Sequence, residues 1–349
     1  MRYLDIDFWG SFIIEQAQKF WLQFHLPAEL LTLLFGLVKA AAVLGLILVT
    51  VLFLVWLERK ISAHVQLRLG PMRTGRWHGW AQTIADAIKL FLKEDIVPEA
   101  ADRWIHFLAP VVTFVPALLC FAVIPFSRLM VAADLNVGLL YVFSLSSITV
   151  IGIIMAGWGS NNKYTLLGGI RSAAQMVSYE IPRALSILPV VMWAGSLKLS
   201  EIVLAQKGMW FIAYPVVGQL AFLLYLISSV AETNRIPFDL PEAEAELVAG
   251  FNTEYCGLKF AFFFLSEFAY VFLASVLAAA LFFGGGAGPW LPSWIWFFVK
   301  TYAIIFLIMM FRWTYPRLRV DRLMDFSWKF LLPLAFINIV LAGILFLIF

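Results

Sequence analysis

Two carboxylates lie inside long apolar segments of the sequence, where an ionised side chain is costly. Glu180 lies in the run RSAAQMVSYEIPRAL, and Glu267 lies in FFFLSEFAY. In a segment that crosses a lipid bilayer, a charge at the centre costs about 2.5–3.5 kcal/mol on insertion scales, so each acid needs a partner or a water-filled cavity. Acids at this depth are typical of proton relays, and this is the chemistry that they predict.

The residues near each acid leave a structural interpretation open beside the functional one. Arg183 lies three residues after Glu180, on the same face of a helix, and Pro182 leaves the carbonyl of Ser178 without its helical donor. This set suits an ion pair that stabilises a kink, and it also suits a proton-relay site beside a cavity. Glu267 has no basic neighbour on its own helix, which suits either a proton-exchanging acid or a neutral acid hydrogen-bonded between helices.

The densest group of acids lies in the segment AETNRIPFDLPEAEAELVAGFNTEYCGLK, residues 231–259. Asp239 is suited to cap a helix whose first turn holds Pro241, so a solvated, well-capped helix start is the structural interpretation. Clustered carboxylates also repel one another, which favours proton binding by some of them and could begin a proton or cation pathway. The acids are Glu232, Asp239, Glu242, Glu244, Glu246 and Glu254, against Arg235 and Lys259 as bases.

The segment 58–105 combines basic residues with an amphipathic pattern. Its first bases follow an apolar run directly, which suits either contact with lipid phosphate or a polar mouth for an amphipathic ligand. Further on, the spacing of apolar side chains predicts a helix on the membrane surface. The bases are Arg59, Lys60, Arg68 and Arg73; the polar stripe of the helix is Gln82, Asp86, Lys89 and Lys93, opposite Ile84, Ile88, Phe91 and Leu92.

The composition of the 349 residues decides which elements can position these groups. Hydrophobic residues make up 62% and charged residues 13%, against about 45–50% and about 25% in soluble proteins. So few charges cannot cover so much apolar surface in water, which excludes a water-soluble globule, and the apolar content also excludes intrinsic disorder. The predicted fold class is an all-α polytopic membrane protein, with residues 1–349 forming a single transmembrane domain.

Apolar runs of about 20 residues predict about eight transmembrane helices. Residues 1–29 are expected to form an outer interfacial arm, and the large inner loops are 58–105 and 231–259. The four inner loops hold 17 lysine and arginine residues, against five in the arm and the outer loops, so we expect the long loops to be cytoplasmic and both termini to lie outside. The predicted spans are roughly 30–57, 106–126, 139–157, 173–195, 210–230, 260–283, 295–311 and 330–349.

Redox chemistry by the chain itself is not indicated. The four histidines do not pair within spans as haem ligation requires, and Cys120 and Cys256 form no Cys-x-x-Cys motif for zinc or an iron–sulfur cluster. We therefore predict no metal site and no cofactor bound by this chain, so that a partner would supply electrons. The net charge of +3 is too small for a nucleic-acid surface.

Five runs of the sequence resemble the H subunit of bacterial NADH:quinone oxidoreductase, the respiratory complex I component whose mitochondrial counterpart is NADH dehydrogenase subunit 1. The likeness extends over roughly residues 50–335 and includes every inner loop. The runs are ERK…Q-x-R-x-GP, ADAIKLFLKEDIVP, GGIRSAAQMVSYE, AETNRIPFDLPEAEAELVAGFNTEYCGLK and WTYPRLRVDRLMDFSWKFLLPLA.

This resemblance implies a membrane subunit at the junction with the peripheral arm of the complex, in the bacterial inner membrane. It implies that the chain and neighbouring subunits build a chamber that admits quinone, the substrate, from the lipid. It also implies that carboxylates couple quinone reduction to proton translocation. Electrons would arrive from FMN and iron–sulfur clusters in partner subunits of the peripheral arm, and other membrane subunits would adjoin the chain.

By position in these runs, the resemblance assigns roles to individual residues. Arg59 matches the family's arginine at the quinone entrance, and Asp86 matches an acid of the first-loop helix. Together with Arg235, these two residues would belong to the quinone chamber. The coupling acids match Glu180, Glu232, Glu242, Glu244 and Glu246, and the further site residues, without an assigned step, are Glu254, Glu267 and Arg183.

The likeness fails at one point. Where the family reads Asn-Arg-Val-Gly-Pro, this chain has Met72, Arg73, Thr74, Gly75 and Arg76. The lost proline and the added arginine would change the loop or its partner contacts, so no role is transferred to residues 72–79.

Three other functions remain compatible with the residues. The first is the equivalent subunit of a membrane-bound hydrogenase or formate hydrogenlyase, some of which need no quinone. The second is a stand-alone proton or cation transporter, which Glu180 and Pro182 would suit because transporters use broken helices. The third is a purely structural scaffold.

Overall fold

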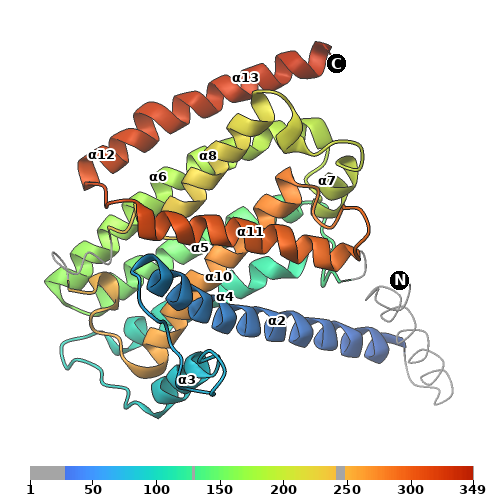
Figure 1. Ribbon diagram of the computed structural model, residues 1–349. Coiled ribbons are helices and arrows are strands. Elements are labelled where there is room, and N and C mark those ends of the chain that lie inside the picture. The colour runs from blue at the N-terminus through green and yellow to red at the C-terminus, as the bar shows by residue number, and fades with distance from the viewer. Residues whose placement is uncertain (1–27, 128–129, 241–247, 349) are drawn as a thin grey trace.

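The computed structural model describes residues 28–127, 130–240 and 248–348, and these form helices and loops with no β-strand among them (Figure 1). The all-α fold class is thus confirmed for the described residues. In chain order the α-helices are α2 (Ala28–Val65), α3 (Gln82–Leu92), α4 (Arg103–Leu119), α5 (Gly138–Gly159), α6 (Lys163–Ala194), α7 (Leu199–Ala205), α8 (Val217–Glu232), α10 (Gly257–Phe282), α11 (Ser293–Thr314), α12 (Val320–Asp325) and α13 (Leu332–Ile348). Single 3-10 turns are η2 (Cys120–Val123), η3 (Phe211–Ala213) and η4 (Gly250–Asn252), and a π-helical turn, η5 (Phe326–Leu331), joins α12 to α13.

Helix α10 is the axis around which the other helices pack. Its sequence is apolar on all sides, which is typical of a helix that is covered all round, and 67% of its most apolar stretch is buried inside the protein. It packs against α2, α3, α4, α8 and α11. Side chains on α10 can therefore meet side chains from most of the other long helices.

Helices α4, α5, α6 and α8 pack one against the next beside this axis. Glycines allow the close approach of α4 and α5. A Cβ atom on Gly152 of α5 would lie 2.6 Å from Cγ2 and 2.9 Å from the backbone nitrogen of Thr113 on α4. Larger side chains at this crossing would push the two helices apart.

Each of the eight predicted spans contains a helix of the structure, but the helix of the predicted span 210–230 begins only at Val217. Six helices of the described residues are long and apolar enough to cross a membrane, and α6 becomes a seventh when it is taken with α7, which is bent from it by 64°. The remaining helix, α8, is apolar but has 16 residues. The prediction of about eight spans is therefore approximate, and the chain is an integral membrane protein by the number and composition of these helices.

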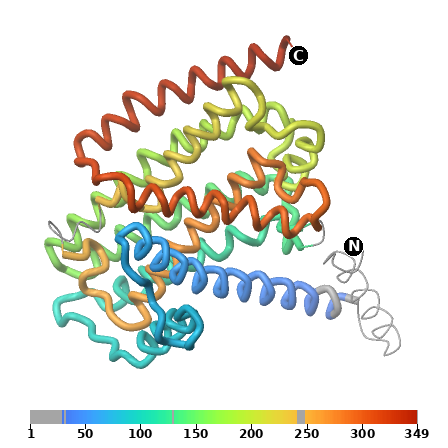
Figure 2. Tube along the Cα trace, in the orientation of Figure 1, coloured from blue at the N-terminus to red at the C-terminus, as the bar shows by residue number. Residues whose placement is uncertain are grey.

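The helices bring the predicted inner loops to one end of the molecule. The first described residues of α2 and the last residues of α13 both lie on the right-hand side in Figures 1 and 2, α2 at the bottom and α13 at the top, and residues 66–102 and 248–256 lie toward the left-hand side. This agrees with an even number of crossings. Which end faces the cytoplasm stays a prediction.

The helix predicted in the first inner loop is confirmed as α3, and its position on the membrane surface stays a prediction. It packs against α2 and α10 at the loop end of the molecule. Its side chains Ile84, Ile88, Phe91 and Leu92 are exposed, as expected of an apolar face that meets lipid or a partner. Residues 1–27 of the predicted outer arm lie outside the described residues.

The crossing of α4 and α5 gives a test of the packing. We expect Gly152→Ala to lower the melting temperature of the protein, because overpacking a tight contact costs about 1–3 kcal/mol. Gly45→Ala on α2 is the matched control, since nothing lies within 4 Å of the added methyl group. Thermal unfolding in detergent measures both, and equal melting temperatures for the two variants would contradict the close approach.

Candidate functional site

The buried guanidinium of Arg235 joins two carboxylates from different helices. Its Nη1 atom lies 2.8 Å from Oε2 of Glu58 on α2, and its Nε atom lies 3.1 Å from Oε1 of Glu267 on α10. The guanidinium also lies over the ring of Phe268, 4.3 Å from its centroid. Arg235 is 3% exposed, so these partners replace the water that its charge loses.

Glu58 is shared between two arginines. Its other oxygen, Oε1, accepts a hydrogen bond from Arg312 near the end of α11. One buried carboxylate therefore ties α2 to α11 and to the turn that follows α8. Because Arg59 is the next residue of α2, this cluster directly adjoins the surface where α3 packs.

A second buried ion pair joins α6 to α8. Nη1 of Arg183 donates to Oε2 of Glu232, and both residues are almost fully buried, at 2% and 6% exposure. The guanidinium also lies over the rings of Phe143 and Tyr225, at 5.2 Å and 5.7 Å from their centroids. Aromatic faces and one carboxylate together compensate this charge in a low-dielectric surrounding.

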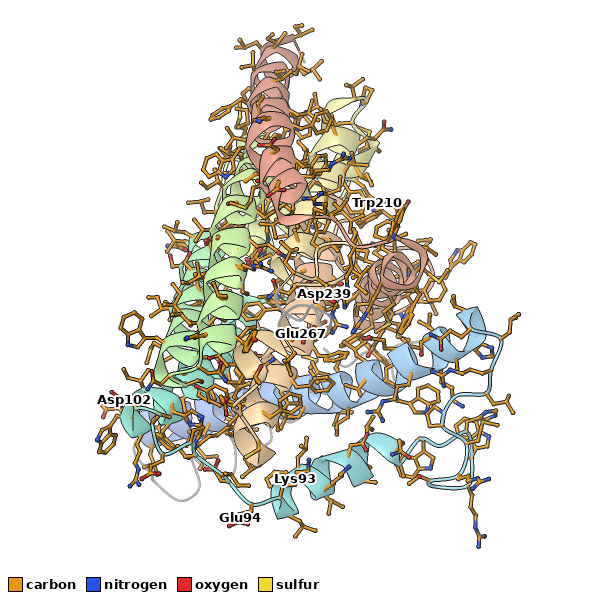
Figure 3. All side chains as sticks on the ribbon, turned by 90° about the vertical axis from the view of Figure 1, so that its left-hand side faces the viewer. Lys93, Glu94, Asp102, Trp210, Asp239 and Glu267 are labelled. Carbon is orange, nitrogen blue, oxygen red and sulfur yellow. The ribbon has the colours of Figure 1, made fainter. Side chains whose placement is uncertain are left out.

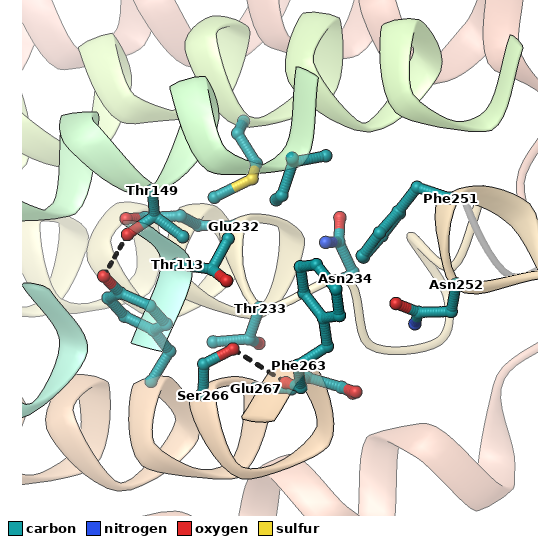
Figure 4. Close-up of a pocket in the computed structure, with 13 residues that line it drawn as sticks. Thr113, Thr149, Glu232, Thr233, Asn234, Phe251, Asn252, Phe263, Ser266 and Glu267 are labelled. Carbon is teal, nitrogen blue, oxygen red and sulfur yellow. Dashed lines mark hydrogen bonds between the residues drawn. The ribbon is translucent and has the colours of Figure 1, made fainter. Parts of the chain in front are cut away.

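A small cavity adjoins both ion pairs; we name it the polar cavity after the polar side chains that meet there, although Ile153, Met176 and Phe263 also line it. It has a volume of about 40 Å³, enough for a water molecule, and Glu232 and Glu267 both line it (Figure 4). The other polar side chains of its wall include Thr233, Asn234 and Ser266. The cavity thus brings the carboxylate of the α6–α8 pair and the carboxylate on α10 to a common space.

Gln175 of α6 holds the turn that carries these residues. The two N–H groups of its Nε2 atom donate to the carbonyls of Ala231 at 2.7 Å and Phe238 at 2.6 Å, and Oδ1 of Asn234 lies 3.2 Å from the same nitrogen. The carbonyls at the end of a helix have no partner within it, and a buried amide supplies one here. The position of Arg235 between its two acids depends on this turn.

An apolar cavity of about 340 Å³ lies between α2, α3 and α10. Arg59 and Asp86 line it and form an ion pair across α2 and α3, with side chains that are 41% and 34% exposed. The apolar part of its wall includes Val55, Leu90, Phe91, Phe262 and Leu265. A cavity with apolar walls and one charged pair is suited to a ligand with a polar head and an apolar body.

The structure separates two of the predicted residues from these clusters. Glu180 accepts a hydrogen bond from Ser147 of α5. Arg183 pairs with Glu232 rather than with Glu180, which does not support the structural interpretation of an ion pair within α6. Glu254 accepts from Nδ2 of Asn162 at 2.6 Å.

The residues around Glu254 form a contact of their own. Its neighbour Tyr255 stacks on His106 at 4.1 Å between ring centroids, and burial raises the pKa of the Tyr255 phenol. Tyr255 therefore stays protonated and acts as a packing residue at the start of α10.

The remaining predicted acids fall in different places. Glu267 has a basic partner, Arg235, from another element, which its own helix could not supply. Asp239 is buried, with Oδ2 2.9 Å from Nη2 of Arg317, and Figure 3 shows Asp239 and Glu267 near the centre of the molecule viewed from its loop end. Glu242, Glu244 and Glu246 lie outside the described residues.

Comparison with known proteins gives a single answer. The family model described as NADH dehydrogenase matches residues 38–343. The chain belongs to the NADH dehydrogenase family. It is 50% identical over 319 residues to the H subunit of the NADH-quinone oxidoreductase of Geobacillus kaustophilus. The aligned residues cover 90% of this chain and 94% of that protein.

Other relatives carry the same description. The H subunit numbered 1 of Geobacter metallireducens is 50% identical over 88% of this chain and 95% of its own length. The H subunit of Dehalococcoides mccartyi strain CBDB1 is 51% identical over 88% of this chain and 86% of its own length. The family resemblance stated from the sequence is therefore confirmed over nearly the whole chain.

For this NADH dehydrogenase family member, sequence reasoning missed three residues of the site. They are Glu58, Arg312 and Gln175, each of which ends or interrupts an apolar run. The signal for Glu58 was available, since it is an acid at the end of a predicted span. Its partners were not, because they lie 177 and 254 positions further along the chain.

The described residues contain no group of three or more His, Cys, Asp and Glu side chains that could hold a metal ion. The charged groups of the site instead pair with one another. What this arrangement can do chemically is to hold, exchange and move protons among carboxylates whose basic partners stay charged.

The α6–α8 ion pair gives a test of the site's energetics. We expect Glu232→Leu to destabilise the protein by about 3–5 kcal/mol, because it leaves the Arg183 charge buried without a carboxylate. The double variant Arg183→Leu with Glu232→Leu should recover most of that loss. Thermal unfolding compares the variants, and a double variant less stable than Glu232→Leu would contradict a paired burial.

Proposed function

We propose that this chain is the membrane subunit of an NADH:quinone oxidoreductase that forms the quinone-access chamber and couples quinone reduction to proton translocation. The observation that carries the proposal is the series of paired charges that begins at Arg59 and Asp86 beside the apolar cavity. It continues through the neighbouring Glu58 to Arg235 and Glu267, and across the polar cavity to Glu232.

Quinone access is assigned to the apolar cavity between α2, α3 and α10. A quinone has a long apolar tail and a headgroup with carbonyl oxygens, which accept hydrogen bonds. The walls of the cavity suit the tail, and the half-exposed guanidinium of Arg59 has further N–H groups for a carbonyl oxygen. The amphipathic pattern of α3 supports a position of this opening at the membrane surface.

Coupling is assigned to the paired carboxylates. Reduction of a quinone to a quinol takes up two electrons and two protons, so charge changes next to Arg59 and Glu58. Charges a few ångströms apart interact strongly where water is scarce, and Glu58 shares Arg235 with Glu267. A change at the quinone would therefore alter proton affinity at Glu267 and, across the polar cavity, at Glu232.

The proposal extends to residues and partners outside the described part of the chain. Glu242, Glu244 and Glu246 would continue the carboxylate series near Asp239. FMN and iron–sulfur clusters in peripheral-arm subunits would deliver the electrons, and other membrane subunits would receive the coupled charge. The membrane of the proposal is the bacterial inner membrane, and the long loops, including Glu242, Glu244 and Glu246, would lie on its cytoplasmic side.

Quinone access is tested at its charged mouth. We expect Arg59→Met to raise the KM for quinone about tenfold in the assembled complex, since a hydrogen bond to a charged group is worth about 1.5–3 kcal/mol. Arg319→Met is the matched control, because Arg319 and its partner Asp321 are both highly exposed. Steady-state quinone reduction measures both variants, and an unchanged KM for Arg59→Met would refute the assignment.

Coupling is tested by removing single charges. Glu180→Gln, Glu232→Gln and Glu242→Gln should each lower the number of protons translocated per NADH oxidised in proteoliposomes. Glu201→Gln at the opposite end is the control, since Glu201 is largely exposed. Normal quinone reduction together with normal proton translocation in all three site variants would contradict the coupling role.

The identity of the electron donor has a separate test. Purification of the native complex should recover an NADH-oxidising flavoprotein with this chain, identified by mass spectrometry. Recovery of a hydrogenase or formate-oxidising subunit in its place would move the chain to the alternative complexes. Ion transport by the purified chain alone in liposomes would favour a stand-alone transporter.

A further inference from the structure

A short series of hydrogen bonds connects the loop 66–81 to the charged mouth of the apolar cavity. We infer that Thr74 and Gln82 are positioning residues that fix the Asp86–Arg59 pair and thereby tune how tightly quinone binds. This inference rests on the proposed function of that cavity. It assigns a role to Thr74, which lies in the segment where this chain departs from the family sequence.

The hydrogen bonds converge on the carboxylate of Asp86. Oγ1 of Thr74 donates to Oε1 of Gln82 at 2.7 Å, and Nε2 of Gln82 donates to Oδ1 of Asp86 at 3.2 Å. The other carboxylate oxygen of Asp86, Oδ2, accepts from Nη1 of Arg59. Each donor meets an acceptor, so the four side chains form one ordered series.

The loop that carries Thr74 is fixed to α2 at two points. Nζ of Lys60 donates to the carbonyl of Pro71 at 2.7 Å, and Nε1 of Trp56 donates to the carbonyl of His78 at 3.1 Å. Gly79 closes the loop at φ +66°, where a Cβ atom would lie 2.4 Å from the oxygen of Pro71. Thr74 is thus held over the first turn of α3.

The Gln82 amide is held between Asp86 and Thr74. An amide can present either its oxygen or its NH₂ group to a neighbour, but an ionised carboxylate can only accept, so the NH₂ group faces Asp86. The amide oxygen then faces Thr74, and the Thr74 hydroxyl donates to it and holds the amide in this orientation. A carboxylate with a donor on each oxygen is held in one orientation.

The orientation of Asp86 in turn holds the guanidinium of Arg59. Arg59 and Asp86 both line the apolar cavity, so this orientation decides where the remaining N–H groups of Arg59 point. Without the Thr74 hydroxyl, the amide oxygen of Gln82 loses its donor, the NH₂ group is held less firmly against Asp86, and the pair loses one of its constraints. The expected consequence is weaker quinone binding with unchanged chemistry once quinone is bound.

The experiment measures quinone kinetics per assembled complex in native membranes. Thr74→Val keeps the shape of the side chain and removes its hydroxyl, and we expect it to raise the KM for quinone about threefold with kcat unchanged, as for the loss of one hydrogen bond. Gln82→Met removes the same link from α3 and should have the same effect. Thr74→Ser restores the hydroxyl and should return KM toward that of the parent.

Thr314→Val is the matched control for loss of a threonine hydroxyl. Thr314 is exposed, and its hydroxyl donates to the carbonyl of Met310 on its own helix at 2.8 Å. A KM shift confined to the Thr74 and Gln82 variants supports the inference. An equal shift for Thr314→Val, or no shift for Thr74→Val and Gln82→Met, overturns it.

An Asp86→Asn background separates this inference from the proposed function. If Thr74 acts through Asp86, Thr74→Val adds nothing to the KM shift of Asp86→Asn. Equal shifts in both backgrounds overturn the inference and leave the quinone cavity standing. If Arg59→Met and Asp86→Asn both leave KM unchanged, quinone does not use this mouth, and the proposed function and the inference both fall.

Discussion

The charge of Arg235 is the constraint on which the rest of the site depends. A guanidinium does not give up its proton in a protein, and this one is almost fully buried. Its charge must therefore be balanced in place, and Glu58 and Glu267 do so from α2 and α10. Three distant parts of the chain are held at one point, because carboxylates from two different helices share the charge of one buried guanidinium.

Several other features follow from this constraint. The turn after α8 must hold Arg235 in place between its two carboxylates. Gln175 fixes this turn by donating to the carbonyl of Ala231 at its start and to the carbonyl of Phe238 at its end. Glu58 carries a second arginine, Arg312, so α11 is joined to the same cluster. The apolar axis α10 makes such a meeting possible, since it touches most of the long helices.

The same arrangement connects the surface of the protein with its interior. Residues 58 and 59 are neighbours on α2 but face different surroundings: Glu58 is buried among arginines, whereas Arg59 meets Asp86 at a half-exposed mouth. Two adjacent side chains on a helix point about 100° apart. Arg59 lines the apolar cavity, and the preceding residue, Glu58, belongs to the buried charge cluster. A ligand in the cavity would thus contact a residue that is the direct chain neighbour of this cluster.

The sequence by itself determined the class of the protein and the elements that carry its site. Its apolar runs predicted the helices, because a segment of about 20 apolar residues has few other stable states than a membrane span. The amphipathic spacing predicted α3. The position of Glu180 and Glu267 within apolar runs identified these two acids as candidate site residues. Local chemistry decides these features, so local reasoning reached them.

Only the tertiary structure decided which charges meet. Helical spacing suggested that Arg183 pairs with Glu180, three positions away, but it pairs with Glu232, 49 positions along the chain. Arg235 meets Glu58 across 177 positions. The physical reason is that a buried charge takes the partner that packing brings within reach, and the packing of α10 against its neighbours depends on all of the helices at once. For the same reason, Glu180 accepts a hydrogen bond from the Ser147 hydroxyl of α5 and does not pair with Arg183 of its own helix.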